Sequence, residues 1–514
     1  MKVNPVLLSD SYKQFHHLMY PEGLLKLYSN GTARSFKHMG TDRAVFFGLQ
    51  YYIKEYLIKQ WSEEFFNKDI ELIKAEYKRF HKYFSGVDDI STTHIEKLHE
   101  LGYLPLEIKA LPEGSKVKEK VPFYTITNTV DGFGWLVNFL ETPMSTAIWH
   151  SCVVATIGYQ YRQVLDEYAL ETTGSTDGVQ WQGHDFSMRG LSSVESSFSQ
   201  AAWLLFFSGT DTIPAVLALE EYYGADMSKE LLGASVPATE HSVMTSYGKE
   251  EEITAFKRLL TQFPTGILSV VSDSLDLWKV LTEFMVELKD QILARDGKLV
   301  IRPDSGDPVD IICGADLDSL IKSEKYDINY NEYFNLPEHK GVIELLWDVF
   351  GGTVNEQGYK VLDPHIGAIY GDSISLDRAK QICERLKQKG FASTNIVFGV
   401  GSYTMNYNTR DSIGFAVKST YCEVLEEIPE SLAEYPFSYT PKKIGREIFK
   451  DPITDDGIKK SAKGLLAVFK DEEGEFYLKD QCIWNEEKTG ELKTVFLNSE
   501  LIIDQTFSEI KARI

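Results

Sequence analysis

Charged and small polar residues follow a series of short apolar runs in the middle of the chain. The runs include residues 267–271, 298–301, 366–370 and 395–398, and the residues that we place at such ends are Asp211, His241, Asp273, Arg302, Asp304, Asp372, Gly401 and Ser402. Carboxylates accept hydrogen bonds from sugar hydroxyls, and an arginine anchors the sugar or balances its charge. Small residues let backbone N–H groups approach a phosphate. The set therefore suits a phosphorylated, polyhydroxylated ligand.

Each of these residues also has a structural interpretation. An aspartate after a strand often caps the next helix, so Asp273 and Asp372 could do no more than that. Residues 302–306 form an ordinary turn sequence, and a lone histidine such as His241 more often makes a structural hydrogen bond than acts in catalysis. Phe186 would usually belong to a core. The recurrence of such residues at successive strand ends is what favours a shared site.

The elements that must position these residues alternate between strands and helices. One such helix is expected to begin at a capping box, Ser192 with Glu195, and to end near Gly209. The alternation predicts a parallel α/β fold. In a barrel all strand ends converge on one face, whereas an open sheet gathers them at one switch point. Because so many ends are polar, we predict an irregular parallel (β/α) barrel.

A second, mixed α+β domain is expected to be built from the N- and C-terminal segments. The first 140 residues mix helical stretches with a strand-rich piece, and after residue 395 the alternation becomes irregular while basic residues cluster. We therefore expect residues 1–140 and 395–514 to form the two parts of this domain. Residues 141–394 are then the catalytic barrel.

The net charge of −23 argues against nucleic acid as a partner, because binding phosphates needs a basic surface. An anion site must therefore be a local basic cluster that works against the overall field. Each candidate alone could be a solvated surface side chain. The candidates outside the barrel segment are Arg34, Arg410, Lys418, Lys450, Lys459, Lys460 and Lys463.

The five cysteines are scattered and never form a CxxC pair, which indicates free thiols in a reducing compartment and no zinc site. The N-terminus lacks an apolar core of signal-peptide length, and no apolar run approaches the 18 residues of a membrane span. We therefore expect a cytoplasmic protein without a membrane partner. Phosphate-binding P-loop, HExxH and GxSxG motifs are absent.

Ordered blocks over nearly the whole chain form a more specific pattern. They include residues 8–13, 47–51, 104–114, 184–190, 209–212, 235–242, 270–274, 301–306, 370–372, 409–411 and 449–452. These blocks resemble the nicotinamide phosphoribosyltransferases, type II phosphoribosyltransferases related to nicotinate phosphoribosyltransferase. The resemblance implies transfer of a 5-phosphoribosyl group from phosphoribosyl pyrophosphate to nicotinamide, which gives nicotinamide mononucleotide and pyrophosphate in NAD salvage.

The resemblance also implies a slot for the nicotinamide ring. Phe186 and Tyr12, the latter from the partner subunit, match the aromatic residues that sandwich the ring, and such stacking contributes about 0.5–1.5 kcal/mol beyond area burial. Arg189 resembles the arginine at the edge of the slot. Asp211 resembles the carboxylate that accepts a hydrogen bond from the carboxamide and would repel nicotinate.

The remaining family roles concern the sugar, the phosphates and ATP. His241 matches a phosphorylatable histidine that couples ATP hydrolysis to synthesis, and Asp273 matches a carboxylate that positions neighbouring groups, His241 among them. Mg²⁺ would arrive with phosphoribosyl pyrophosphate rather than at a metal site of the protein, and a homodimer with shared active sites is implied. The ribose and 5′-phosphate set is Arg302, Asp304, Gly371, Asp372, Gly401 and Ser402, and the pyrophosphate set is Arg34, Arg410, Lys418, Lys450 and Lys459.

Two other functions remain open. A nicotinate phosphoribosyltransferase would share most of these residues, and Asp211 is what argues against it. A non-catalytic protein that binds pyridine nucleotides would be expected to lose charged strand-end residues, yet the whole set is present.

Overall fold

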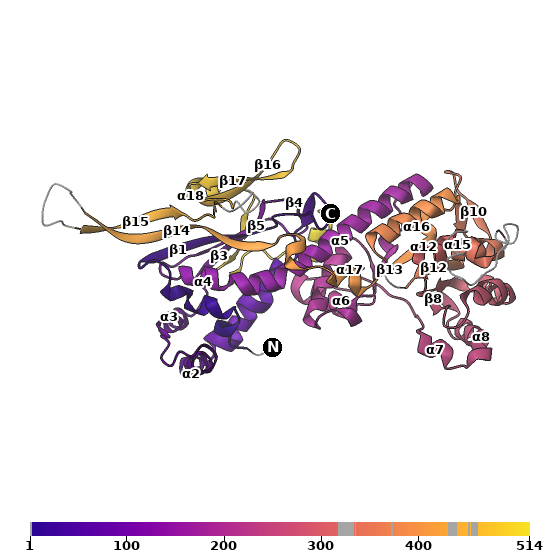
Figure 1. The fold of residues 1–514 in the computed structure, drawn as a ribbon, viewed down its shortest axis with the longest axis horizontal. Coiled ribbons are helices and arrows are strands. Elements are labelled where there is room, and N and C mark those ends of the chain that lie inside the picture. The colour runs from indigo at the N-terminus through magenta and orange to yellow at the C-terminus, as the bar shows by residue number, and fades with distance from the viewer. Residues whose placement is uncertain are drawn as a thin grey trace. The chain divides into compact units, whose positions relative to one another are not determined.

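The computed structural model describes residues 3–316, 334, 336–371, 374–429, 439–450, 453 and 461–514. They form two compact units (Figure 1). Unit 1 comprises Met1–Thr156, Ala218–Ala225 and Asn408–Ile514, and unit 2 comprises Ile157–Leu217 and Asp226–Tyr407. Two of the four unit boundaries fall inside helices, one in α5 (Glu141–Thr173) and one in α6 (Ile213–Tyr223).

A curled parallel sheet forms the centre of unit 2. Its strands, in spatial order, are β7 (Gly209–Thr210), β6 (Gly183–Asp185), β13 (Ile396–Val400), β12 (Ile366–Tyr370), β9 (Asp296–Arg302) and β8 (Thr265–Val271). Every neighbouring pair is parallel. The parallel α/β organisation predicted from the alternation is therefore confirmed.

Residues 234–239 pair with both edge strands of this sheet. Ala234 forms a parallel bridge with Gly209 beside β7, and Ala238 forms one with Ser269 of β8. The backbone N–H of Ala234 donates to the Ser208 carbonyl at 2.7 Å, and that of Thr239 donates to the Ser269 carbonyl at 3.0 Å. This segment therefore connects β7 and β8, the two edge strands of the sheet.

Apolar strands and amphipathic helices bury the core of unit 2. β8 ends in the buried residues Val270 and Val271, and β9 buries Leu299, Val300 and Ile301 before it ends at Arg302, as expected for parallel strands covered on both faces. Helix α16 (Leu376–Gln388) begins at Ser375, whose Oγ accepts from the Arg378 N–H at 3.3 Å. Its buried residues repeat at helical spacing and are Ala379, Ile382, Cys383 and Leu386. The other helices of this unit include α7 (His241–Thr245), α8 (Glu252–Gln262), α12 (Pro308–Cys313), α15 (Pro337–Phe350) and α17 (Ser402–Asn406).

The predicted capping box of Ser192 and Glu195 is wrong. The helix is a 3-10 helix that begins at Glu195 and ends at Leu205, and no side chain caps it. Instead, Ser193 and Ser196 exchange hydrogen bonds between side chain and backbone, each at 3.0 Å. The reciprocal contact is therefore formed one residue further along the chain, between Ser193 and Ser196.

Unit 1 is built on an antiparallel sheet formed by both ends of the chain. Its strands, in spatial order, are β15 (Tyr439–Glu447), β14 (Ala416–Pro429), β1 (Leu24–Thr32), β5 (Pro122–Asn128), β3 (Leu106–Ala110), β18 (Lys493–Leu497) and β19 (Glu500–Leu501). Leu27 faces helix α4 (Gly134–Phe139), while Tyr28 packs against the hairpin of β16 (Leu465–Lys470) and β17 (Phe476–Cys482). The two faces of the sheet are therefore covered by different elements (Figure 1).

A buried carboxylate holds the block at residues 47–51 in unit 1. Glu113 accepts from the backbone N–H groups of Gly48 and Gln50, at 3.0 and 2.7 Å, and from the Tyr223 hydroxyl at 3.0 Å. Burial raises the pKa of Glu113, while these donors oppose the shift. The contacts fix the start of α1 (Leu49–Tyr52), and the other helices of this unit include α2 (Ile70–Phe80), α3 (Thr93–Leu101), α18 (Trp484–Glu487) and α19 (Phe507–Lys511).

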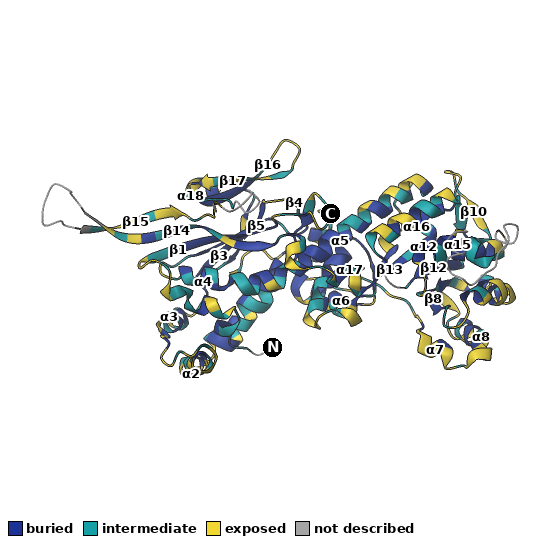
Figure 2. Cartoon of the chain, viewed as in Figure 1, coloured by how far each residue is buried: buried dark blue, intermediate teal, exposed yellow. Residues whose placement is uncertain are grey.

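Burial is concentrated in central strands such as β5 and β13, whereas β15, at one edge of the sheet of unit 1, is largely exposed (Figure 2). All five cysteines are buried and free, which confirms the predicted absence of disulfides. Within the described ranges, no helix combines the length and apolarity needed to cross a membrane.

Candidate functional site

A cavity of about 550 Å³ lies among the strands of unit 2. On β9 the alternate residues Lys298, Val300 and Arg302 all line it, as expected for side chains on one face of a strand. The other lining residues that bear on the site are His184, Phe186, Gly209, Asp211, Ser235 and Ser269. A pocket of this size is typical of a small-molecule site.

Phe186 follows β6 and lines this cavity with one edge of its ring packed on a glycine. Its backbone N–H donates to the Val400 carbonyl at 3.0 Å. A Cβ at Gly399 would lie 2.9 Å from the Phe186 ring, so a side chain there would displace it. The Arg302 guanidinium lies 5.9 Å from the ring centre. The aromatic ring and a cation are therefore held together at the cavity wall.

Asp211 lies after β7, where two donors meet one of its carboxylate oxygens. His184 Nε2 lies 2.9 Å from Oδ1, and the Ser235 hydroxyl donates to the same atom. Burial alone would raise the pKa of Asp211, but the hydrogen bonds from His184 and Ser235, together with the charge of Arg302, outweigh burial and lower it. The carboxylate is therefore held in its charged form at the cavity.

Arg302, at the end of β9, is fixed against the backbone of the 234–239 segment. Its guanidinium donates to the Thr239 carbonyl. Burial lowers the pKa of Arg302, and the carboxylates of Asp304 and Asp211 oppose that shift. A Cβ at Gly371 would lie 3.3 Å from the side chains of both Arg302 and Asp304, so Gly371 leaves room for them.

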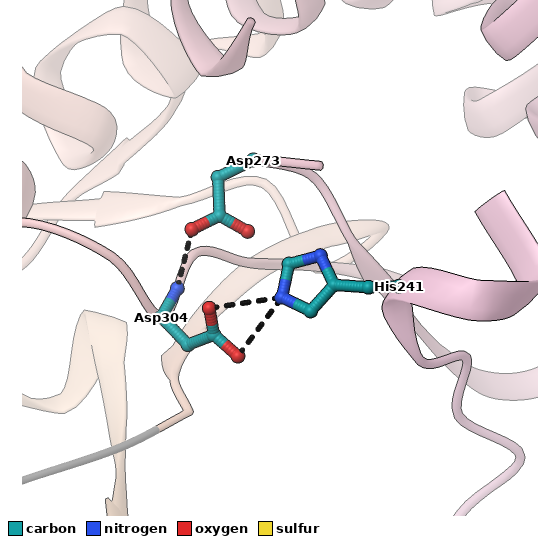
Figure 3. A group of neighbouring side chains, drawn as sticks. All are labelled: His241, Asp273 and Asp304. Carbon is teal, nitrogen blue, oxygen red and sulfur yellow. Dashed lines mark hydrogen bonds and ion pairs between the residues drawn. The ribbon is translucent and has the colours of Figure 1, made fainter. Parts of the chain in front are cut away.

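His241, Asp273 and Asp304 form a polar cluster beside these strand ends (Figure 3). His241 Nε2 lies 3.1 Å from Asp304 Oδ1, and its Nδ1 lies 2.9 Å from the Ser274 hydroxyl. Asp273 Oδ2 accepts from the backbone N–H groups of Asp304 and Ser305, at 2.9 and 2.8 Å. The carboxylate that contacts His241 is therefore that of Asp304, and Asp273 fixes the turn that carries Asp304.

Arg189, Gly401 and Ser402 lie close together in unit 2. Ser402 begins α17, and a Cβ at Gly190 would overlap its side chain, so the turn that carries Arg189 packs directly on it. Asn406 Nδ2 donates to the Gly190 carbonyl at 2.6 Å. Asp372, the remaining predicted ribose residue, lies outside the described residues.

The other predicted residues belong to unit 1. Lys418 on β14 is 52% exposed and pairs with Glu141 at 2.6 Å, and Glu141 also binds the buried Lys13 at 2.7 Å. The Tyr12 side chain is exposed, and the charges of Glu141 and Arg410 act on its hydroxyl. Arg34 and Lys450 are exposed as well, while Lys459 lies outside the described residues.

The structure thus brings Phe186, Asp211 and Arg302 to one cavity, with the His241 cluster on neighbouring strand ends. It also adds residues that the sequence did not single out: His184 and Ser235 on Asp211, Ser274 on His241, and Ser269 and Lys298 in the cavity wall. The sequence did hold one indication of His184. It lies two positions before Phe186 in an extended segment, and residues two apart in such a segment point to the same side.

Known proteins resemble this chain over most or all of its length. It is 46% identical to the nicotinamide phosphoribosyltransferase of Acinetobacter baylyi, over all of this chain and 97% of that relative. It is 37% identical to the nicotinamide phosphoribosyltransferase of Mycoplasma pneumoniae, over 81% of this chain and 88% of that relative.

Solved structures share the fold at low sequence identity. A human nicotinic acid phosphoribosyltransferase superposes with a TM-score of 0.51 at 14% identity, over 99% of this chain and 93% of that one. A Pyrococcus furiosus nicotinate-nucleotide pyrophosphorylase gives 0.52 at 14% identity, over 99% and 94%. The model of the nicotinate phosphoribosyltransferase (NAPRTase) family matches residues 181–500. The chain therefore belongs to the NAPRTase family, as its sequence blocks had indicated.

Proposed function

We propose that the protein transfers the 5-phosphoribosyl group of phosphoribosyl pyrophosphate to nicotinamide, in NAD salvage. The observation that carries this proposal is the charged Asp211 beside Phe186 in the cavity. A carboxylate accepts a hydrogen bond from the NH₂ of a carboxamide, whereas the carboxylate of nicotinate offers no donor and is repelled. The names of the relatives support the same substrate.

Nicotinamide would stack on Phe186, with Arg189 near the slot. Tyr12 of a second copy of the chain would cover the other face of the ring, which makes the active enzyme a homodimer. The exposure of the Tyr12 side chain, 59%, leaves it available for such a contact. Stacking would hold the pyridine nitrogen in line with C1 of the ribose, and positioning of this kind supplies a large part of the acceleration.

The reaction exchanges one bond at C1 of the ribose. The C1–O bond breaks and its electron pair leaves with pyrophosphate, while the pyridine nitrogen supplies the pair for the new C1–N bond. Arg302, Asp304 and Asp372 would hold the ribose, and Gly371, Gly401 and Ser402 would hold the 5′-phosphate. The charge that grows on pyrophosphate would be stabilised by a basic set, namely Arg34, Arg410, Lys418, Lys450 and Lys459.

Phosphoribosyl pyrophosphate would enter as its Mg²⁺ complex, in which the metal neutralises charge on the leaving group. The residues present fit such a complex. Asp273 Oδ1 is buried and accepts no hydrogen bond from any residue that the structure describes. Asp273 also belongs with His241 and Asp304 to a group whose possible ligand atoms lie within 4.8 Å of one another. Carboxylate oxygens are the protein ligands that Mg²⁺ prefers.

ATP would act through His241. The Asp304 carboxylate can only accept, so it favours the tautomer with hydrogen on Nε2, and the lone pair is then on Nδ1. Attack of Nδ1 on the γ-phosphate would form a P–N bond while the P–O bond to ADP breaks. His241 is 48% exposed in its side chain, which leaves it accessible.

Three further features belong to this proposal. The parallel sheet closes into an irregular (β/α) barrel through residues 234–239. The catalytic barrel corresponds to the predicted residues 141–394 extended by β13 (Ile396–Val400), and the N- and C-terminal segments on either side form the second domain. The enzyme works in the cytoplasm.

Substitution of Asp211 by Asn tests the proposed substrate. Wild-type protein should convert labelled nicotinamide to its mononucleotide, and D211N should lose most of the preference for nicotinamide over nicotinate, by about 10-fold or more, because the repelling charge is gone. The preference is measured as the ratio of kcat/KM values. Asp177→Asn is a matched control, since Asp177 lines the same cavity without contacting Asp211.

A nicotinate phosphoribosyltransferase is the alternative, and the family model and solved neighbours carry that name. Preferred turnover of nicotinate by the wild-type protein would establish it. Absence of turnover with either substrate would reject both.

A further inference from the structure

His184 is the residue whose position the proposed function leaves unexplained. It lines the cavity, contacts Asp211 through Nε2, and among the other described residues predicted to bind substrate it contacts only the ring of Phe186. We propose that His184 is a positioning residue that, together with Ser235, orients the Asp211 carboxylate and thereby sets selection of amide over acid. This inference rests on the proposed function.

The two donors act on a single oxygen of Asp211. His184 Nε2 and the Ser235 hydroxyl both contact Oδ1, whereas Oδ2 accepts no hydrogen bond from any residue in the described part of the chain. A carboxylate oxygen has two lone-pair sites, so two donors occupy Oδ1. Oδ2 is then the atom left to accept from a carboxamide.

Three elements that are distant in sequence hold this arrangement. His184 comes from β6, Asp211 follows β7, and Ser235 belongs to the segment that bridges both edge strands. In addition, the Asp211 N–H donates to the Asp185 carbonyl at 2.9 Å, which fixes its backbone beside β6. The carboxylate is therefore restrained from both sides and from its own main chain.

His184 itself has little freedom to turn. Its side chain is only 12% exposed, and its ring lies 4.4 Å from that of Phe186. A Cβ at Gly209 would lie 2.8 Å from His184 Nδ1, so the ring packs directly on the Gly209 backbone. This packing keeps Nε2 directed at Asp211.

The choice of histidine matters for charge. An imidazole can donate a hydrogen bond without carrying a permanent charge, unlike lysine or arginine. Asp211 therefore keeps its negative charge toward the ligand while it is held in place. A permanent cation at position 184 would cancel that charge and remove the repulsion of nicotinate.

The test compares two substitutions that differ in donor capacity. His184→Gln retains an N–H at about the reach of Nε2, and His184→Leu retains bulk without a donor. We expect H184L to raise KM for nicotinamide by about 10- to 100-fold, the range for loss of a hydrogen bond to a charged group, and to lower the nicotinamide-to-nicotinate ratio of kcat/KM. KM for phosphoribosyl pyrophosphate should stay within about threefold, and H184Q should recover most of the ratio. Ser235→Ala should lower the ratio less, because one donor remains.

A ratio in H184L within about twofold of wild type would overturn the inference, and so would equal losses in H184Q and H184L, because packing rather than the donor would then be responsible. If H184L does not fold, Gly209→Ala displaces the ring without removing it, and an unchanged ratio in that variant is equally decisive. Lack of wild-type turnover would instead defeat the proposed function, and the comparison would pass to the binding of nicotinamide and nicotinate by calorimetry in the same variants.

Discussion

The histidines of the two units differ in the partners that surround them. In unit 2 the histidines of the candidate site each face a carboxylate: His184 faces Asp211, and His241 faces Asp304. In unit 1 a histidine cluster has no carboxylate partner among the residues that the structure describes. His17 and His94 stack with ring centres 3.7 Å apart, and within the same described part of the chain each has a buried ring nitrogen without a hydrogen-bond partner.

The cations of the two units also differ in how they are held. Arg302 of unit 2 is bound to a backbone carbonyl and lies between two acids, whereas Lys418 and Lys13 of unit 1 share the single carboxylate of Glu141. The pairs of unit 2 are fixed before any ligand arrives, which is what catalysis by positioning requires. The Lys418–Glu141 pair instead lies where the lysine side chain is open to solvent.

Loss of the Asp304 charge should give the largest effect. Asp304→Asn keeps an acceptor oxygen for His241 but removes the negative charge that faces both His241 and Arg302, so kcat/KM for nicotinamide mononucleotide synthesis should fall about 1000-fold, within the range for general acid–base and positioning groups. Initial-rate kinetics measure this fall. Asp307→Asn is the control, because Asp307 only caps α12. A fall below about tenfold in D304N would show that the fixed pairs of unit 2 are dispensable.

The histidine cluster of unit 1 should make the protein sensitive to acid. Burial and the neighbouring charges of His17 and His81 lower the pKa of His94 to about 3, against 6.5 for an ordinary histidine. Below pH 6.5 the unfolded chain therefore binds a proton that the folded chain does not, and stability decreases by about 1.4 kcal/mol per pH unit. Between pH 7 and 5 the loss should be about 2 kcal/mol.

Denaturant unfolding at several pH values measures this slope. His94→Gln should flatten it, whatever its effect on stability at pH 7. His99→Gln, on the same helix α3, is the matched control and should leave the slope unchanged. An equal slope in H94Q would show that acid sensitivity arises elsewhere.

The exposed cation of unit 1 should give the smallest effect. Lys418→Ala should raise KM for phosphoribosyl pyrophosphate by about 10-fold, because one charge-assisted contact to a phosphate is lost. Added salt screens this contact, so it should raise the KM of the wild-type protein toward that of the variant. Lys443→Ala is the control, since Lys443 is also exposed on the same sheet and pairs with Asp131. Equal behaviour of the two variants would remove Lys418 from the pyrophosphate set.

Much of unit 2 could be predicted because its strands are buried on both faces and so appear as continuous apolar runs. β12 coincides with the predicted residues 366–370, and β8, β9 and β13 differ from the predicted runs by one or two residues at one or both ends. The polar residues that follow these strands can then be assigned to one site, since the carboxyl ends of parallel strands lie at the same edge of the sheet. These features depend on local sequence.

The partners of those residues could not be predicted, because they come from distant segments. Only the fold shows that Ser235 reaches Asp211, or that the carboxylate on His241 belongs to Asp304 rather than Asp273. The predicted capping box was wrong because Ser192 and Ser193 are adjacent and either could make the local contact. Ser193 is the one that makes it, with Ser196. Spacing identifies the residue types but does not decide between neighbours.

The interleaved order of the two units has a consequence for synthesis of the chain. Strand β1 pairs on one edge with β5 but on the other with β14, whose residues emerge from the ribosome about 400 positions later. At ordinary rates of translation that interval is roughly 20–80 s. All of unit 2 is synthesised during this interval and can fold first. Until β14 appears, one edge of β1 has unpaired backbone groups that can pair with other chains. Production of this enzyme therefore depends on how well the cell shields that edge until the last hundred residues appear.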